Sequence, residues 1–204
     1  MENTFQRKDL GIAVIGSGRI GTLRAIMAKN HAAVKFIACS DRDPARAKKL
    51  ADKVGAQFHS GDNLEVISRP EVNAVVVSTI ELEHTQPILQ ALALGKPVLV
   101  EKPLAFDFAE ADKILAAAKK AGADLRVGYS RRFKDKYLLA KEQLTNGRLG
   151  RITSGMARVF NSRSQATATL SRLPADTSSL SGLVYYVDLM HWLLAGKDRK
   201  STRL

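Results

Sequence analysis

Three glycines near the N-terminus have the spacing of a phosphate-binding turn. Gly16, Gly18 and Gly21 form the pattern G-x-G-x-x-G, with Arg19 and Ile20 between the last two. In a dinucleotide-binding fold the first glycine allows a sharp turn, the second lets the backbone approach a pyrophosphate, and the third brings a helix close to a strand. The N–H groups at the start of such a helix attract phosphates. Because glycine-rich turns also serve packing alone, the motif needs support from its surroundings.

Asp41 and Arg42 follow an apolar run over residues 34–40, and Asp41 lies 20 residues beyond Gly21. A dinucleotide-binding fold places an acid at this distance, where it accepts hydrogen bonds from the hydroxyls of the adenosine ribose. Because a carboxylate repels a 2′-phosphate, the sequence predicts NAD as the preferred cofactor. Arg42 could pair with that phosphate and keeps NADP open as a second cofactor. The alternative for Asp41 is a turn or helix-capping residue ahead of Pro44.

Lys102 has the residue type and the place for proton transfer. It follows Glu101 and the apolar triplet of residues 98–100, and it is therefore expected at the carboxyl end of a parallel strand. Ligands bind beside such strand ends, and partial desolvation there makes an ammonium group a useful acid or polariser. The alternative is a surface ion pair between Glu101 and a neighbouring base.

These residues depend on alternating strands and helices to bring them together. Short apolar runs predict buried strands, and amphipathic segments between them predict helices. The predicted strands cover residues 12–15, 34–40, 72–79, 98–100 and 125–129, with a short one near Phe58, and the predicted helices cover residues 22–29, 44–51, 84–93 and 108–121. Such alternation predicts an α/β fold, a doubly wound parallel sheet of the Rossmann type, over residues 8–128.

The pattern changes after Arg131. Residues 136–145 predict a helix, residues 151–160 alternate as in a strand, residues 162–181 are polar and irregular, and residues 183–194 have the apolar spacing of a buried helix. Residues 129–196 are therefore expected to form the truncated start of an α+β domain. Residues 197–204 have no apolar period and are expected to be a non-native tail.

Composition and charge limit the class of protein. The 204 residues are 45% hydrophobic, enough for a packed core, and the single cysteine, Cys39, falls in a predicted strand. One cysteine without a leader or a long apolar run predicts a cytoplasmic protein, with no membrane partner and no metal site. The net charge of +12 comes mostly from basic residues dispersed over residues 128–204. They form no nucleic-acid-binding motif and have no interleaved aromatic residues, so no nucleic-acid partner is predicted.

Four features together resemble the Gfo/Idh/MocA oxidoreductases, which include glucose–fructose oxidoreductase and inositol dehydrogenase. They are the glycine turn, the strand-end Asp41, the tripeptide Glu101-Lys102-Pro103 and the sequence Gly-Tyr-Ser-Arg-Arg-Phe at residues 128–133. The resemblance covers about residues 11–196. It implies NAD(P)-dependent oxidation or reduction of a small-molecule substrate at a secondary alcohol or ketone of a sugar, cyclitol or related polyol. It also implies that Lys102 contacts both the nicotinamide ribose and the substrate hydroxyl.

The resemblance implies further cofactor contacts from Ser78, Thr79, His84 and Glu101. Family members usually have Thr-Pro-Asn after the third strand of this domain, with a histidine a few residues on. Here Ile80 and Glu81 replace Pro-Asn, although His84 matches. The loop that lines the cofactor is therefore altered. By itself, His84 could equally be a polar residue at the start of a helix.

Family enzymes also carry an Asp and a His four residues apart at the start of the second-domain helix. The preferred alignment puts Ser181 and Tyr185 there, and a rival alignment uses Asp188 and His191, which are three apart. Tyr185 is predicted to be catalytic as a proton relay, with the Lys102 ammonium favouring its anion. Its alternative role is a core aromatic residue. The atypical pair leaves a second hypothesis, a catalytically inactive regulatory protein that senses dinucleotides.

The resemblance implies a longer protein. Family members continue past residue 196 through a large open sheet with substrate and subunit contacts, so residues 129–196 are expected to be part of a substrate and oligomerisation domain. The parent is expected to be a homo-oligomer, and this chain alone is expected to be inactive. An exposed apolar stripe is predicted on the last helix, formed by Val184, Val187, Met190 and Leu194.

Overall fold

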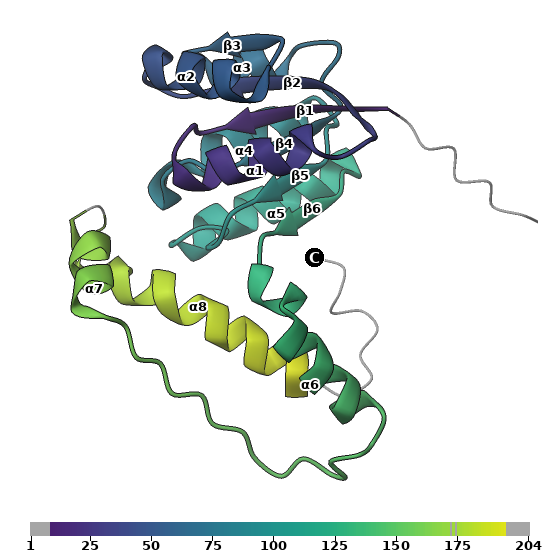
Figure 1. Ribbon diagram of the computed structural model, residues 1–204, viewed down its shortest axis with the longest axis vertical. Helices are drawn as coiled ribbons and strands as arrows, with labels where there is room; N and C mark the ends of the chain where they lie inside the picture. The colour runs from purple at the N-terminus through teal and green to yellow at the C-terminus, as the bar shows by residue number, and fades with distance from the viewer. Residues whose placement is uncertain (1–8, 172, 174, 195–204) are drawn as a thin grey trace, which may run out of the picture. The chain divides into compact units, whose positions relative to one another are not determined.

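The computed structural model describes residues 9–194 apart from residues 172 and 174. The chain divides into two compact units, Met1–Val127 and Gly128–Leu204, which are described separately (Figure 1). The tail expected at residues 197–204 lies outside the described residues. Within the described part of the chain, no helix is long and apolar enough to cross a membrane.

The first unit is built on a six-stranded sheet. Its strands are β1 (Leu10–Ile15), β2 (Val34–Ser40), β3 (Phe58–Ser60), β4 (Ala74–Val77), β5 (Val98–Val100) and β6 (Leu125–Val127). They lie in the order β3-β2-β1-β4-β5-β6, which can be followed down Figure 1, and every neighbouring pair is parallel. This is the strand order of the Rossmann fold. The predicted α/β class with a doubly wound parallel sheet is confirmed.

The connections between the strands are mostly helical. They are α1 (Arg19–Lys29), α2 (Pro44–Val54), α3 (Asn63–Ile67), the 3₁₀ turn η1 (Glu81–Glu83), α4 (Thr85–Ala93) and α5 (Phe108–Ala121). Asp43, Asp62 and Asp107 each accept a hydrogen bond from the first turn of the helix that follows, and so cap α2, α3 and α5. At α1 the capping position is Gly18, and no side chain caps this helix.

The central strands are buried on both faces because helices cover each side of the sheet. On β1, Ala13 and Ile15 pack in a cluster with apolar residues of α3, α4 and α5. Val14 points the other way, into a cluster with residues of α1 and α2. Cys39 belongs to this second cluster, and burial raises the pKa of its thiol to about 12. The thiol is therefore a core group and not a nucleophile.

The second unit is helical in its described residues. It contains the 3₁₀ turn η2 (Ser130–Phe133), α6 (Asp135–Thr145), α7 (Arg163–Leu170) and α8 (Ala175–Leu194). The strand predicted over residues 151–160 is wrong, because residues 152–162 have no regular structure and are almost all exposed. A strand needs a neighbour for its backbone N–H and C=O groups, and the described residues of this unit contain no other strand.

Most of the segment over residues 162–181, predicted to be irregular, is helical. Ser162 begins α7 with a capping box, in which its side chain and that of Gln165 each accept from the other's backbone N–H. This local pairing satisfies the first donors of the helix and outweighs the polar composition. The helix predicted over residues 183–194 is present as the later part of α8, which begins at Ala175.

The predicted apolar stripe on α8 is present only in part. Val187 is 67% exposed and Leu194 39%, whereas Val184 and Met190 are half-buried. The C-terminal end of α8 is held by Lys141 of α6. Its ammonium donates to the carbonyl oxygen of Trp192 at 2.6 Å, which satisfies one of the last carbonyls of the helix.

Candidate functional site

The predicted cofactor residues of the first unit converge at one edge of the sheet. Strands β1, β2, β4 and β5 are parallel, so their carboxyl ends share an edge. The residues that directly follow these strands are Gly16, Asp41, Ser78 and Glu101. The connections switch direction between β1 and β4, and this is where open α/β sheets bind ligands.

Gly16 and Gly21 are required by the fold. Gly16 has a φ of +94°, and a Cβ on it would lie 2.6 Å from the carbonyl oxygen of Ser78. Its N–H donates to the carbonyl oxygen of Ser40 at 2.9 Å. A Cβ on Gly21 would overlap the carbonyl oxygen of Gly16, so only glycine lets α1 start this close to β1. Both positions need glycine whether or not a ligand binds.

Gly18 is different, because packing does not require a glycine there. Its φ of −73° suits any residue. The nearest heavy atom that a Cβ would meet is Nη2 of Arg46, at 3.4 Å, at the end of a flexible side chain. The position is the uncapped start of α1, whose first turn contains no acidic residue. The space in front of Gly18 and the positive end of the helix together fit a pyrophosphate.

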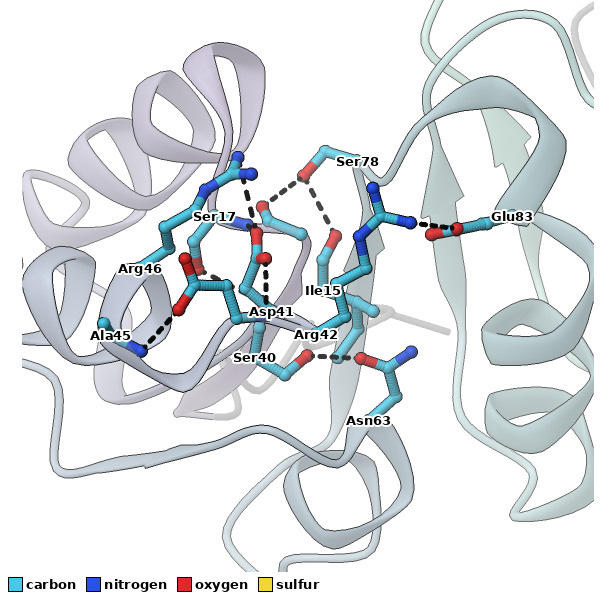
Figure 2. Close-up of polar contacts among 12 residues, drawn as sticks. Ile15, Ser17, Ser40, Asp41, Arg42, Ala45, Arg46, Asn63, Ser78 and Glu83 are labelled. Carbon is cyan, nitrogen blue, oxygen red and sulfur yellow. Dashed lines mark hydrogen bonds and ion pairs between the residues drawn. The ribbon is translucent and has the colours of Figure 1, made fainter.

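Asp41 is a buried acid, with 7% of its surface exposed. Its Oδ2 accepts a hydrogen bond from the N–H of Ser17 at 2.9 Å, and its Oδ1 accepts from the N–H of Asp43 at 3.1 Å. The contact with Ser17 ties the end of β2 to the glycine turn (Figure 2). Each carboxylate oxygen has a second lone pair, so the group can still accept from a ribose hydroxyl. Ser17 was missed at the sequence level because its contact is made by the backbone.

Two arginines flank Asp41 and reach different partners (Figure 2). Arg42 donates to Oε1 of Glu83 at 2.8 Å, and both side chains are well exposed. Arg46, in the first turn of α2, places Nη2 3.6 Å from Oδ2 of Asp41. Sequence reasoning singled out Arg42 and missed Arg46. The signal for Arg46 was its place in the first turn of the helix that follows the acid.

Ser78 and Thr79 have different surroundings. The Ser78 hydroxyl lies 3.2 Å from the carbonyl oxygens of both Ile15 and Gly16, and so holds β4 to the glycine turn. The Thr79 hydroxyl is buried and has no hydrogen-bond partner within the described part of the chain. A buried polar group without a partner is costly.

His84 is almost fully buried, with 1% of its surface exposed. Its Nδ1 lies 2.9 Å from the carbonyl oxygen of Pro103, so the ring links the loop after β4 to the loop after β5. Burial lowers the pKa of His84 below its usual value, which keeps the ring neutral. The ring thus positions the segment that contains Lys102.

Glu101 forms an ion pair with Arg24 of α1, another residue that sequence reasoning missed. Arg24 Nε donates to Oε1 at 2.7 Å, and only 18% and 12% of the two side chains are exposed. An ion pair between Glu101 and a neighbouring base was expected as the alternative at this position. The pair is present, but it is largely buried and does not lie at the surface. Lys102 follows directly, half-buried, and its peptide bond to Pro103 is cis.

The second unit holds the remaining predicted residues. The Arg131 guanidinium lies over the ring of Tyr185, 5.1 Å from its centroid, and over Tyr186 at 4.5 Å. Asp188 is engaged by Arg132, whose Nε donates to Oδ2 at 2.9 Å and whose Nη2 contacts Oδ1.

Ser181 is buried and His191 is exposed. The choice between the alignment through Ser181 and Tyr185 and the alignment through Asp188 and His191 stays a prediction. Among the described residues, no three His, Cys, Asp or Glu side chains gather as metal ligands would.

Known proteins are similar to this chain in sequence and in fold. Inositol 2-dehydrogenase of Acidothermus cellulolyticus is 34% identical over 195 residues, which cover 95% of this chain and 56% of that protein. Inositol 2-dehydrogenase of Gluconacetobacter diazotrophicus is 32% identical over 192 residues, with 92% and 55% covered. This chain therefore spans about half the length of the curated relatives it matches.

Solved structures agree on the fold. Scyllo-inositol dehydrogenase from Lactobacillus casei, with bound NAD(H) and scyllo-inositol, superposes with a TM-score of 0.78 at 23% identity, with 92% of this chain and 57% of that chain covered. GenD2 from gentamicin A biosynthesis, in complex with NAD, gives a TM-score of 0.76 at 28% identity, with 93% and 54% covered.

The model of the oxidoreductase family with an NAD-binding Rossmann fold matches residues 10–129, more than half of the chain. This match confirms the family resemblance carried by the glycine turn, Asp41 and the Glu101-Lys102-Pro103 tripeptide, and it agrees with the sheet order. The chain belongs to the Gfo/Idh/MocA family of oxidoreductases and has that family's NAD-binding Rossmann fold.

Proposed function

We propose that this chain is the coenzyme-binding part of an NAD-dependent dehydrogenase that acts on a secondary alcohol of a cyclitol or related polyol. The proposal combines the family with the named activities of the relatives, several of which are inositol 2-dehydrogenases. One observation in the chain itself carries it. Gly18 has room for a side chain, yet it is a glycine at the uncapped start of α1. Close approach of a ligand's phosphates explains this choice of residue.

Several groups of the first unit would hold the dinucleotide. The backbone around Gly18 and the start of α1 would take the pyrophosphate, and Asp41 would accept from the adenosine ribose. The Thr79 hydroxyl, buried without a partner among the described residues, would gain a hydrogen bond. Asp41 is held in place by two backbone N–H groups before any ligand arrives. This preorganisation lowers the cost of binding.

Lys102 and Tyr185 would handle the substrate's proton. Bound NAD supplies the hydride acceptor. Loss of hydride from a secondary alcohol also requires removal of the hydroxyl proton. Lys102, at the end of β5, would bind and polarise that hydroxyl, and Tyr185 would relay the proton.

The organisation beyond the coenzyme site is part of the same proposal. Residues 8–128 would form the dinucleotide-binding domain, and residues 129–196 part of a substrate and oligomerisation domain. We propose a homo-oligomeric, cytoplasmic enzyme. The exposed Leu183 and Val187 on α8 support an association surface, and the single buried cysteine suits a reducing compartment.

The test uses the product of the complete gene. Reduction of NAD would be followed by absorbance with myo-inositol, scyllo-inositol, glucose and a linear polyol as separate substrates. Turnover on one or more cyclitols is expected. The Lys102→Met variant should lose this turnover while it still binds NADH, more weakly because the contact with the nicotinamide ribose is gone. NADH binding without turnover on any polyol would instead support the dinucleotide-sensing regulatory protein.

A further inference from the structure

Lys102 lies between two residues that are each held by a buried contact. Before it, Glu101 accepts from Nε of Arg24 at 2.7 Å, and Nη2 of the same guanidinium lies 2.6 Å from the same oxygen, Oε1. After it, the carbonyl oxygen of Pro103 lies 2.9 Å from Nδ1 of the buried His84 ring. The short segment that contains Lys102 is therefore held at both ends.

The two contacts come from opposite faces of the sheet. Arg24 is on α1, which packs with α2 on the face to which Val14 points. His84 directly precedes α4, which packs on the other face. In the sheet, β4 lies between β1 and β5, so Arg24 reaches past β4 to meet the end of β5. The two contacts thus restrain the segment in different directions.

The backbone of Glu101 is fixed by β4, independently of its side chain. Its N–H donates to the carbonyl oxygen of Val77 at 2.9 Å. Its carboxylate is buried and paired with Arg24. A buried carboxylate that loses its cation turns toward water, because an unpaired charge is strongly disfavoured in the interior. Loss of Arg24 should therefore displace the residue just before Lys102 while β5 stays paired with β4.

Accurate placement matters for a group that binds and polarises a reacting hydroxyl. A displacement of about 1 Å can lower a reaction rate by roughly 100-fold. Lys102 is half-buried, and its long side chain reaches a position that its backbone decides. Arginine suits the anchoring of this backbone, because two nitrogens of one rigid plane contact the Glu101 carboxylate.

We propose that Arg24 is a positioning residue of the reaction, which acts through Glu101 to place the ammonium group of Lys102 against the substrate hydroxyl. This role rests on the proposed function of Lys102 and adds a residue of α1 to it. The helix starts next to Gly18. The element that would bind the pyrophosphate of the coenzyme is thus also the element that fixes the lysine.

The first test uses the 204-residue chain and needs no substrate. Lysines are acetylated below the melting transition of each variant, and mass spectrometry of peptides gives the labelling rate of Lys102. Arg24→Met should raise this rate about 3-fold or more, because a released segment opens more often. The exposed Lys113 on α5 is the internal reference and should keep its rate. Lys48→Met breaks an exposed pair with Asp52 and, as the matched control, should leave Lys102 unchanged.

The second test measures turnover of the complete gene product on a cyclitol that it oxidises. Arg24→Met should lose about 10-fold or more in kcat. Its KM for NAD should change less than about 3-fold, because the glycine turn and Asp41 still hold the coenzyme. Arg24→Lys keeps a cation for Glu101 and should recover most of the lost kcat. A residue that served only the stability of the fold would not produce this split at a temperature where each variant is folded.

Unchanged labelling of Lys102 in Arg24→Met, or a rise that Lys113 shares equally, would overturn the positioning role. A loss of turnover that appears only in KM would overturn it too, as would an equal loss of kcat in Arg24→Lys. If Arg24→Met does not fold, the milder Arg24→Gln, which keeps a donor for Glu101, should show the same rise in labelling. A complete wild-type protein without turnover would contradict the proposed function instead, and the labelling rates would still decide whether Arg24 fixes the segment of Lys102.

Discussion

At the scale of single residues, the three glycines of one motif have two different roles. Gly16 and Gly21 are fixed by backbone geometry, since a Cβ at either would meet main-chain atoms. At Gly18 a Cβ would meet only a flexible arginine end. A spacing pattern cannot separate these roles, because it records residue type and not the space around it. The space around each glycine separates them, and at Gly18 it is consistent with the proposed approach of a ligand's phosphates.

His84 gives a prediction about pH. Burial lowers its pKa below the usual value of 6.5, so the folded protein binds a proton less readily than the unfolded chain does. The stability due to the neutral ring is complete above about pH 6.5 and is lost as the pH falls through the lowered pKa. Each pH unit in that window should cost about 1.4 kcal/mol.

Urea unfolding of wild type and His84→Gln measures this effect. The measurements are made at several pH values between roughly 8 and 5, a range that includes the usual histidine pKa. The variant will be less stable throughout, because the contact with Pro103 changes, but its stability should fall less steeply with acid. Parallel profiles for the two proteins would show that His84 does not titrate in this way.

At the scale of elements, α1 is joined to β5 by the ion pair of Arg24 and Glu101. The two are 77 positions apart in the chain, and neither sequence segment indicates the other as its partner. Periodicity predicted both elements but not this link. The same reason explains why Ser17 was missed, since its contact with Asp41 joins the glycine turn to the end of β2.

Removing Arg24 should leave a largely buried carboxylate without its counter-charge. Arg24→Met is expected to lower the free energy of unfolding by about 3 kcal/mol. The double variant Arg24→Met with Glu101→Gln should be more stable than Arg24→Met alone, because the unpaired charge is gone. Lys48→Met, which breaks an exposed pair with Asp52, should cost less than about 0.5 kcal/mol.

Chemical denaturation of these variants and of the single Glu101→Gln completes a double-mutant cycle. A coupling energy near zero would mean that the buried pair contributes nothing specific, in which case the close approach of Arg24 to Glu101 does not hold α1 to β5.

At the scale of the whole molecule, the sequence predicted one unit better than the other. In the first unit each strand has neighbours of its own unit, so local apolar runs correspond to real strands. In the second, the alternation at residues 151–160 predicted a strand, yet no other strand is described there for it to pair with. Conversely, the Ser162 capping box makes a helix of residues that composition had suggested were irregular.

Tyr185 is the residue whose proposed role involves the complete protein. Tyr185→Phe keeps the ring over which Arg131 lies and removes only the hydroxyl. In the complete gene product with its substrate, the variant should lose about 100-fold in turnover and keep its NADH affinity. If turnover survives while His191→Ala abolishes it, the alignment through Asp188 and His191 is the correct one.

Binding of NAD by the glycine turn at Gly18 can be tested by one comparison of variants. NADH fluorescence would be titrated against wild type and Gly18→Ala, with urea unfolding measured on both. Gly18→Ala should unfold within about 1 kcal/mol of wild type, since its Cβ has room. It should nevertheless bind NADH at least about 10-fold more weakly. Gly21→Ala, by contrast, should lose the fold. A Gly18→Ala protein that binds NADH as tightly as wild type would show that the phosphates do not approach the backbone at Gly18.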